Sequence, residues 1–432
     1  MKAPTHPRQH VFEVPARHVH FVGIGGIGMS GLAKILIQDG CTVSGSDLAL
    51  NRNTAELERL GARIHQGHDA EHALGAELVV VTSAAFDGNP EVAWAKAHAI
   101  PVLKRAVLLG QLMGQKRGIA VAGTAGKTTT TAMVATILLH AGLDPTIACG
   151  GDLVELDSNA RLGHGAHFVA EADEFDRSFL QLRARTKVIT NIEADHLDLY
   201  GTMDALREAF TQFAAEGTVI LNADDAETEA LARKMGDRAR RFSAFNLQYA
   251  GLDLQVPGAH NRANAAAALA VADSLGIDRS VSVGALNAFQ GTRRRLELMG
   301  EARGIKVIDD YAHHPTKIKA SLAALRELAP TRLVVIFQPH LYARTKDFFD
   351  GFVHAFGDAD DVIVVDTYSP AGREEAREKT SKDLAEAMGV TYVPALEDAA
   401  KAIDPPPGSI VVAMGAGTIT RLPALLLERL RG

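Results

Sequence analysis

A lysine inside a glycine-rich segment is the clearest candidate for chemistry in this chain of 432 residues. The segment Gly123–Thr131 reads GTAGKTTTT and follows Gly118–Ala122, an apolar run typical of a buried strand. Backbone N–H groups of such a loop cradle phosphates, while Lys127 reaches the β- and γ-phosphates and the Thr128 hydroxyl can bind Mg²⁺. Because the longer form of this motif requires glycine at Val121, the match is to a shorter variant. The pattern predicts ATP binding by Gly123, Thr124, Ala125, Gly126, Lys127, Thr128 and Thr129.

Two acidic segments downstream could supply ligands for magnesium. Ala170–Asp176 reads AEADEFD and Thr190–Asp198 reads TNIEADHLD. Both follow apolar runs, so they should lie at the carboxyl ends of strands, where the ligand sites of α/β folds gather. Mg²⁺ prefers oxygen ligands and accepts an occasional imidazole, which makes Glu171 and His196, with Thr128, the candidate ligands. A ligand role and a solvated surface both stay open for Glu174, Asp176, Glu193 and Asp198.

A second glycine-rich turn, nearer the N-terminus, predicts a diphosphate site. His18–Val22 runs into Gly23–Gly31, a helical stretch follows, and a second strand ends at Asp47. Glycines let N–H groups approach a diphosphate at a helix N-terminus, where the helix dipole favours negative charge. NAD(P)-binding proteins share this spacing of glycines and acid, so an oxidoreductase is an alternative. The phosphate loop around Lys127 favours ATP chemistry instead, since hydride transfer needs no such loop.

Composition narrows the class of protein. Hydrophobic residues make up 47% of the chain and charged residues 22%, a mix typical of a globular protein. The formal net charge of −7 argues against general affinity for nucleic acid. Cys41 and Cys149, without a CxxC pair, predict neither a disulfide framework nor a thiolate metal site. Because the sequence has no apolar run of signal-peptide or membrane-spanning type, we expect a cytoplasmic protein that binds neither nucleic acid nor membrane.

Short β-branched runs alternate with Ala- and Leu-rich helical stretches throughout the chain. This alternation predicts an α/β fold with largely parallel sheets. The expected strands are His18–Val22, Thr42–Gly45, Leu78–Thr82, Gly118–Ala122, Val188–Asn191, Thr218–Leu221, Lys306–Asp309, Arg332–Phe337, Asp361–Val365 and Ser409–Met414.

Three α/β series begin near His18, Gly118 and Gly304, with seams around Gly114–Arg117 and Gln290–Arg295. A chain of this length is also too long to form a single hydrophobic core and is expected to divide into several domains. The predicted domains are a Rossmann-like domain over residues 1–115, a central phosphate-loop ATPase domain over 116–291 and a Rossmann-like C-terminal domain over 292–432.

Six motifs follow one another in the same order as in the Mur ligases, and the chain from about His18 onward resembles that family. They are Gly123–Thr131, Glu171–Glu174, Thr190–His196, Gly258–Ala265, Gly291–Arg295 and Asp309–Pro315. Further segments resemble the branch of the family that attaches L-alanine: Gly23–Gly31, Ser44–Asp47, Gly67–Asp69, Asn89–Glu91 and Phe337–Lys346.

The resemblance implies roles at the matching positions. The catalytic residues would be Lys127, Glu171, His196 and Arg295. ATP would also be contacted by Asn261, Asn264, Arg295 and Asp310. The amino-acid pocket would be formed by Tyr311, His313 and Arg344, whose guanidinium can pair with a carboxylate. Uridine diphosphate, rather than NAD, would be held by Gly23, Gly25, Gly26, Gly28, Met29, Ser30 and Asp47.

The implied activity is ATP-dependent formation of an amide bond between the carboxylate of UDP-N-acetylmuramate and L-alanine, through an acyl phosphate, in peptidoglycan precursor synthesis. The expected cofactors are ATP and Mg²⁺, the partners are these two substrates, and the expected assembly is a monomer or homodimer. Three alternatives stay open: a recycling ligase that attaches a tripeptide to the same sugar nucleotide, an NAD(P)-dependent oxidoreductase, and a nucleotide-binding regulator without catalysis.

Three positions depart from the family pattern. Ala125 stands where the alanine-adding branch usually has histidine, and we expect phosphate binding to persist through its backbone N–H. Leu341 stands where some relatives have a second arginine, so the substrate carboxylate would have one anchor fewer. The stretch from about Gln212 to Pro257 is short, which predicts fewer outer strands in the central domain.

Overall fold

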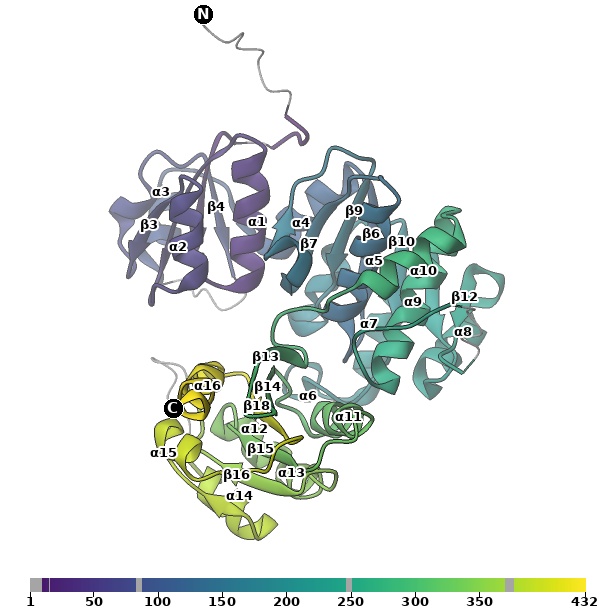
Figure 1. The fold of residues 1–432 in the computed structure, drawn as a ribbon. Helices are drawn as coiled ribbons and strands as arrows, with labels where there is room; N and C mark the ends of the chain where they lie inside the picture. The colour runs from purple at the N-terminus through teal and green to yellow at the C-terminus, as the bar shows by residue number, and fades with distance from the viewer. Residues whose placement is uncertain (1–9, 15, 83–87, 246–250, 370–376) are drawn as a thin grey trace, which may run out of the picture. The chain divides into compact units, whose positions relative to one another are not determined.

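The protein has a three-domain α/β fold, described here in a computed structural model (Figure 1). The structure describes residues 10–14, 16–82, 88–245, 251–369 and 377–432. The chain divides into two compact units. Unit 1 comprises residues 1–253 and 263–289, and unit 2 comprises residues 254–262 and 290–432. Among the described residues, no helix is long and apolar enough to cross a membrane.

The first sheet of unit 1 is parallel, with strand order β3-β2-β1-β4-β5. Its strands are β1 (His18–Val22), β2 (Thr42–Asp47), β3 (Arg63–Gln66), β4 (Leu78–Val81) and β5 (Val102–Lys104). Its helices are α1 (Ile27–Gln38), α2 (Arg52–Arg59), the short 3₁₀ segment η1 (Ala70–Ala73), α3 (Pro90–Ala97) and α4 (Arg105–Gly114). The buried strands β1 and β4 lie at the centre of the sheet, so the glycine-rich turn after β1 opens at its carboxyl edge.

A buried carboxylate surrounded by histidines explains two of the motifs noted in the sequence. Glu91 is fully buried at the start of α3, and Ser46 donates a hydrogen bond to it at 2.9 Å. Its oxygens lie 3.5 Å from His20 Nε2, 3.0 Å from His68 Nδ1 and 3.3 Å from His72 Nδ1. Burial acts to raise the pKa of Glu91, but hydrogen bonding from His20 and Ser46 outweighs it and lowers the pKa. Residues 67–69 and 89–91 therefore have a packing role below the glycine-rich turn.

The second sheet of unit 1 has the order β12-β11-β10-β6-β9-β7-β8. Its strands are β6 (Arg117–Ala122), β7 (Thr146–Leu153), β8 (Ser158–Arg161), β9 (His167–Glu171), β10 (Thr186–Ile189), β11 (Thr218–Asn222) and β12 (Ala239–Phe242). The helices are α5 (Lys127–His140), α6 (Leu197–Tyr200), α7 (Met203–Phe213), α8 (Ala226–Met235), α9 (Ala259–Leu275) and α10 (Arg279–Ala288). Among the described strands of this sheet, only β7 and β8 pair antiparallel. They form a hairpin that packs against α1 of the first sheet (Figure 1).

Pairing within this sheet brings the phosphate loop next to the acidic segments. Val121 of β6 lies opposite Glu171 of β9 and opposite Val188 of β10. Because all three strands run parallel, the segments that follow them emerge at one edge of the sheet. On the other side the sheet ends at β12. The expected loss of outer strands stays a prediction, and residues 246–250 lie outside the described part of the chain.

Unit 2 contains the third sheet, with strand order β13-β14-β18-β15-β16-β17. Its strands are β13 (Glu297–Ala302), β14 (Ile305–Asp310), β15 (Leu333–Phe337), β16 (Asp361–Val364), β17 (Thr391–Tyr392) and β18 (Ile410–Met414). Its helices include α11 (Pro315–Arg326), α12 (Tyr342–Asp347), α13 (Phe349–Val353), α14 (Ser381–Met388), α15 (Leu396–Lys401) and α16 (Leu422–Arg431). The pairs are parallel except β13–β14.

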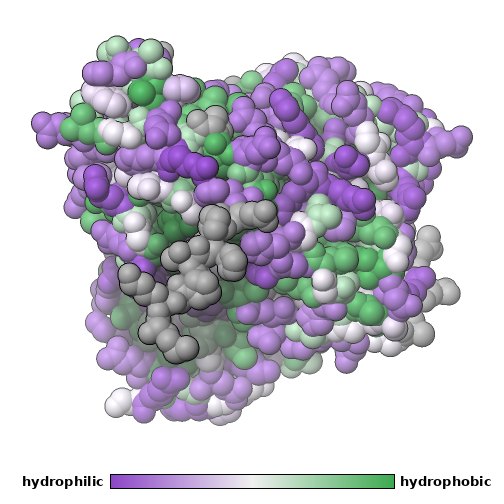
Figure 2. All heavy atoms as spheres, turned by 90° about the horizontal axis from the view of Figure 1, so that it is seen from above, coloured by the Kyte–Doolittle hydropathy of each residue, from purple (hydrophilic) through white to green (hydrophobic). Residues whose placement is uncertain are grey.

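The α/β prediction is confirmed, and each expected strand is present with bounds shifted by at most a few residues. The predicted boundaries at 115/116 and 291/292 stay a prediction. On the face seen in Figure 2, hydrophilic side chains predominate, with smaller hydrophobic areas between them.

Candidate active site

The loop between β6 and α5 has the geometry of a phosphate cradle. Gly123 has φ +130°, and a Cβ there would lie 2.1 Å from Thr190 Oγ1. Gly126 has φ +82°, and a Cβ there would lie 2.5 Å from Asn264 Oδ1, so both positions require glycine. Gly126 is also the N-cap of α5 and has no side chain to occupy the first N–H groups of the helix. The positive end of the α5 dipole is therefore available to an anion.

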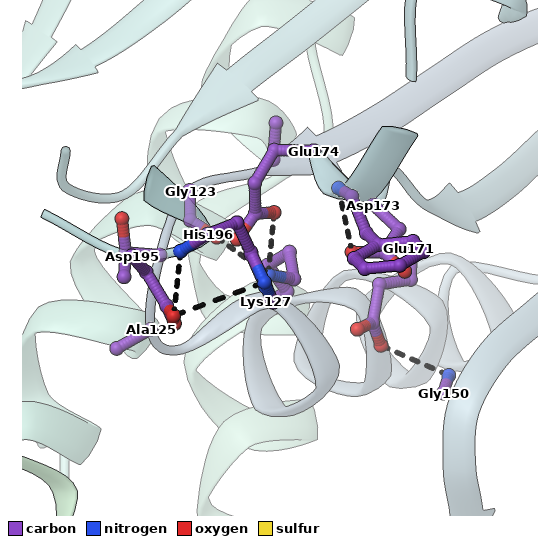
Figure 3. A network of polar contacts seen from close by, with 12 residues as sticks. Gly123, Ala125, Lys127, Gly150, Glu171, Asp173, Glu174, Asp195 and His196 are labelled. Atoms are coloured by element: carbon purple, nitrogen blue, oxygen red, sulfur yellow. Dashed lines mark hydrogen bonds and ion pairs between the residues drawn. The ribbon is translucent and has the colours of Figure 1, made fainter. Parts of the chain in front are cut away.

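Lys127 is partly buried and paired with a carboxylate that the sequence left undecided (Figure 3). Its Nζ lies 2.6 Å and 2.9 Å from the two oxygens of Glu174 and donates to the Gly123 carbonyl at 2.8 Å. Burial acts to lower the pKa of Lys127, but the charges of Glu174, Asp173 and Glu171 outweigh it and raise the pKa. The ammonium is thus held charged, with Glu174 at the place where a phosphate would neutralise it.

Thr128 and Glu171 form a second contact beside the loop. The Thr128 hydroxyl donates to Glu171 Oε2 at 2.8 Å, and the Gly150 N–H donates to the same oxygen at 2.9 Å. Octahedral Mg²⁺ with ligands at about 2.0–2.1 Å places neighbouring ligand oxygens about 2.9 Å apart. The spacing between Thr128 Oγ1 and Glu171 Oε2 therefore fits two ligands of one magnesium ion, and the surrounding carboxylates favour a cation.

The third predicted metal ligand, His196, contacts other groups in this structure. It has φ +54°, its Nδ1 lies 3.9 Å from Asp195 Oδ1, and its ring packs edge-on against Phe175. Across the described residues, no three His, Cys, Asp or Glu side chains gather in a geometry that would hold a metal ion. The structure brings Thr128 and Glu171 together, while a metal-ligand role of His196 stays a prediction.

Two further residues predicted to contact ATP, Ala125 and Asn264, form hydrogen bonds at the phosphate loop. The Ala125 N–H donates to Asn191 Oδ1 at 2.8 Å, and the Thr190 hydroxyl donates to the Ala125 carbonyl at 2.5 Å. The backbone N–H expected to serve phosphate is therefore engaged by Asn191 in this structure. Asn264 on α9 accepts a hydrogen bond from Thr130 at 3.1 Å, which places its side chain against the loop.

The N-terminal glycine turn is held by side chains from the end of β2 and the start of α2. Gly25 N–H donates to Asp47 Oδ2 at 2.9 Å, and its carbonyl accepts from Asn51 and Asn53 at 3.2 Å and 2.8 Å. The N-cap of α1 is Gly26, which again leaves no capping side chain. Met29 and Ser30 are buried, and the Ser30 N–H donates to the Gly26 carbonyl at 2.8 Å, so a contact of these two residues with a ligand stays a prediction. Gly23 has φ +81°, as a tight turn requires.

Unit 2 gathers several predicted residues at the end of β14. The Arg295 guanidinium lies 5.1 Å from the Tyr311 ring centroid, with Arg294 at 5.0 Å. Asp310 is buried and accepts from the N–H groups of Leu296 and Ala312 at 2.8 Å and 2.7 Å. These bonds give Asp310 a structural role in addition to the predicted nucleotide contact. The Asn261 amide donates to the Pro257 carbonyl at 2.7 Å.

The predicted amino-acid residues lie around a histidine ring. His313 Nδ1 lies 2.8 Å from the Tyr311 carbonyl, and the two rings meet edge-on at 4.8 Å. Desolvation, together with Lys317 and Arg344, lowers the pKa of His313 well below its usual value. Arg344 lies 3.0 Å from His340 Nδ1, and His340 in turn stacks on Tyr368. Sequence reasoning did not single out His340, although it lies inside the Phe337–Lys346 motif.

Comparison with known proteins assigns the family. Family models match residues 18–117 ("Mur ligase family, catalytic domain"), 121–250 ("Mur ligase middle domain") and 294–417 ("Mur ligase, glutamate ligase domain"). The UDP-N-acetylmuramate–L-alanine ligase of Geotalea uraniireducens is 44% identical over 451 residues, covering 96% of this chain and 98% of that protein. This chain belongs to the Mur ligase family.

Further relatives agree with this assignment. The UDP-N-acetylmuramate–L-alanine ligase of Acidobacterium capsulatum is 42% identical and covers 96% of this Mur ligase and 98% of its own length. The crystal structure of UDP-N-acetylmuramate-alanine ligase from Thermotoga maritima superimposes with a TM-score of 0.83 at 32% identity, covering 95% and 98% of the two chains. A murein peptide ligase from Psychrobacter arcticus gives a TM-score of 0.71 at 28% identity, covering 96% and 99%.

Glu174 is one of the four carboxylates that sequence reasoning left undecided in this Mur ligase. Acidic residues in a loop are usually solvated, and nothing local marks Glu174 as different from Asp176. The structure separates them, since Glu174 is 1% exposed against Lys127, whereas Asp176 lies on the surface and pairs with Lys104. One feature of the sequence could have indicated the role of Glu174. It lies three residues after Glu171, which ends the strand β9 next to β6.

Proposed function

We propose that this Mur ligase joins the carboxylate of UDP-N-acetylmuramate to the amino group of L-alanine at the expense of ATP. The observation that carries the proposal is the Thr128–Glu171 contact of 2.8 Å beside Lys127 in a glycine cradle, an arrangement suited to a magnesium nucleotide. The choice of substrates is supported by relatives 41–44% identical along nearly the whole chain that are named for this reaction.

The reaction needs activation of a carboxylate, because carboxylate oxygen is a poor leaving group. The carboxylate of UDP-N-acetylmuramate attacks the γ-phosphorus of ATP, and the bond from that phosphorus to the β,γ-bridging oxygen breaks, leaving ADP and an acyl phosphate. The alanine nitrogen then attacks the acyl carbon, and inorganic phosphate leaves from the tetrahedral intermediate. Lys127 and the first N–H groups of α5 would stabilise the charge on the transferring phosphoryl group. Arg295, whose role is implied by the family resemblance, is proposed as a further cation for the phosphates.

Magnesium would be held by Thr128 and Glu171, whose oxygens have the spacing of neighbouring ligands, and it would supply positive charge to the phosphates. The chain itself would orient the incoming amine. His313 Nδ1 faces the Tyr311 carbonyl, which assigns the proton to Nδ1 and leaves Nε2 as an acceptor. The lowered pKa keeps the ring neutral, so Nε2 would accept a hydrogen bond from the alanine ammonium and orient it, and the ammonium would lose its proton to water before attack.

The test measures phosphate release from ATP with Mg²⁺ and UDP-N-acetylmuramate, offering L-alanine, glycine, L-serine or the tripeptide. We expect turnover with L-alanine, and the Lys127→Ala variant should lose at least about 100-fold in kcat. Lys104→Ala, at a 61% exposed lysine paired with Asp176, is the matched control and should keep full activity. If only the tripeptide supports turnover, the amine substrate is the tripeptide and not L-alanine. If no amine supports turnover, the ligase function is refuted.

A further inference from the structure

A lysine in α1 is fully buried and bound by groups from two other elements. The side chain of Lys34 is 1% exposed. Its Nζ lies 2.9 Å from Glu56 Oε2 of α2, 3.0 Å from Asn159 Oδ1 and 3.3 Å from Ser158 Oγ of β8. An ammonium group has three protons, and here each has an acceptor. Burying a charge is costly unless it is paired and hydrogen-bonded, so this geometry fixes α1 relative to the β7–β8 hairpin.

Asn159 extends the same contact to the first turn of α1. Its Oδ1 accepts from Lys34, and its Nδ2 donates to the Ile27 carbonyl at 2.7 Å. A Cβ at Gly31 would lie 2.7 Å from Asn159 Nδ2, so glycine is needed for this close approach. Ile27 is the first residue of α1, directly after the glycine turn. A buried amide from the second sheet thus holds the end of α1 that faces the predicted diphosphate site.

The other strand of the hairpin, β7, contacts a carboxylate beside the phosphate loop. The Gly150 N–H in β7 donates to Glu171 Oε2, which also accepts from Thr128. A Cβ at Gly150 would lie 2.2 Å from that oxygen, so strand and carboxylate are in close contact. The hairpin therefore contacts Glu171, which binds Thr128, through Gly150, and it contacts the first turn of α1 through Asn159.

We propose that Lys34 and Asn159 are positioning residues that, through the β7–β8 hairpin, hold the sugar-nucleotide end of α1 in register with the phosphate loop. The inference rests on the proposed function, because acyl-phosphate formation requires the muramate carboxylate to lie beside the γ-phosphate. Neither residue takes part in the chemistry. Their contribution is the relative placement of two anion sites, and a misplacement of about 1 Å can cost about 100-fold in rate.

The test compares Lys34→Met, which removes the charge and keeps the length, with Asn159→Asp, which keeps an oxygen for Lys34 and removes the amide that donates to Ile27. We expect kcat to fall by about 100-fold and the KM for UDP-N-acetylmuramate to rise, while the KM for ATP stays within about 2-fold. The second variant retains a buried partner for Lys34, so it tests the proposal even where Lys34→Met folds poorly.

Lys116→Met is the matched control. Lys116 is half-buried and donates to the carbonyls of Gly163 and Gly165. We expect this variant to lose stability with an unchanged ratio of the two KM values. Equal loss of affinity for both substrates in the Lys34 and Asn159 variants, or wild-type kinetics in both folded variants, would overturn the proposal.

A ligand-free measurement separates this inference from the proposed function. Hydrogen exchange of the amides in residues 24–34 should accelerate in both variants, with residues 186–189 of β10 unchanged. If wild-type protein shows no turnover of UDP-N-acetylmuramate, the proposed function fails, and the exchange result still decides whether the hairpin holds α1. Exchange at residues 24–34 equal to wild type in both variants would refute the positioning role.

Discussion

Replacing Glu174 by glutamine should act in opposite directions on stability and on nucleotide affinity. In this structure Glu174 neutralises Lys127 at 2.6 Å; the Glu174 side chain is buried, at 2% exposed, and the Lys127 side chain is partly buried, at 13%. Removing one partner of a buried ion pair costs about 3–5 kcal/mol. We take the lower end, about 3 kcal/mol, since the Gly123 carbonyl still accepts from Lys127 and the glutamine amide oxygen can do so too.

The expected loss can be converted into two measurements. Unit 1 has about 280 residues, and for a unit of this size each kcal/mol shifts the melting temperature by about 2 °C. Ligand-free Glu174→Gln should therefore melt about 6 °C below the wild type. If triphosphate replaces the carboxylate at Lys127, the bound state loses little, and the variant should bind ATP more tightly by up to about 100-fold.

The assay is differential scanning calorimetry without ligand, combined with titration calorimetry using ADP and a non-hydrolysable ATP analogue, each with and without Mg²⁺. Asp176→Asn is the control, because it removes the same charge from a surface carboxylate paired with the exposed Lys104. It should change neither quantity. Weaker nucleotide binding by Glu174→Gln, or an unchanged ligand-free melting temperature, would show that Glu174 does not serve as a substitute for phosphate.

Two further predictions concern the metal site and the pH dependence of unit 2. Gly150→Ala places a Cβ 2.2 Å from Glu171 Oε2 and should displace this proposed magnesium ligand. The Mg²⁺ concentration needed for half-maximal turnover should therefore rise, and an unchanged Mg²⁺ titration would contradict the role of Glu171. Because the folded-state pKa of His313 is lowered, the unfolded chain binds more protons, and the stability from this group is lost as pH falls below about 6.5. Urea unfolding of unit 2 should show that the free energy of unfolding falls less between pH 8 and pH 5.5 in His313→Asn than in the wild type. An equal fall in both proteins would contradict the lowered pKa of His313.

Much of the fold could be predicted from the sequence because its central strands have a strong local signal. Runs such as Leu333–Phe337 are apolar and β-branched, and each is followed by a helix. The β7–β8 hairpin was not predicted. Thr146–Leu153 contains two adjacent glycines and lacks alternation, so local propensity is weak there. Its conformation depends on contacts with α1 that lie more than 120 residues away in the sequence.

The candidate site shows the same division between local and tertiary information. The phosphate loop was recognisable because glycine, lysine and threonine must follow one another there. Lys34, by contrast, is a single lysine in a helix, a pattern that normally indicates a solvated side chain. Its burial follows from the packing of a separate sheet against α1. The role of a charged side chain was therefore predictable where it belongs to a contiguous motif, and not where its partners come from distant segments.

The two glycine turns share one further property that bears on ligand binding. In each turn a carboxylate of the protein occupies a donor that the ligand would need: Asp47 accepts from the Gly25 N–H, and Glu174 accepts from Lys127. Buried donors without partners are costly, so these carboxylates stabilise the ligand-free state. Binding a diphosphate or triphosphate is then an exchange of one anion for another, and the measured affinity reflects the difference between them. A substitution that neutralises one of these carboxylates removes a contact of the ligand-free protein that the ligand would replace. A loss of stability without ligand and a gain in ligand affinity therefore have the same physical origin.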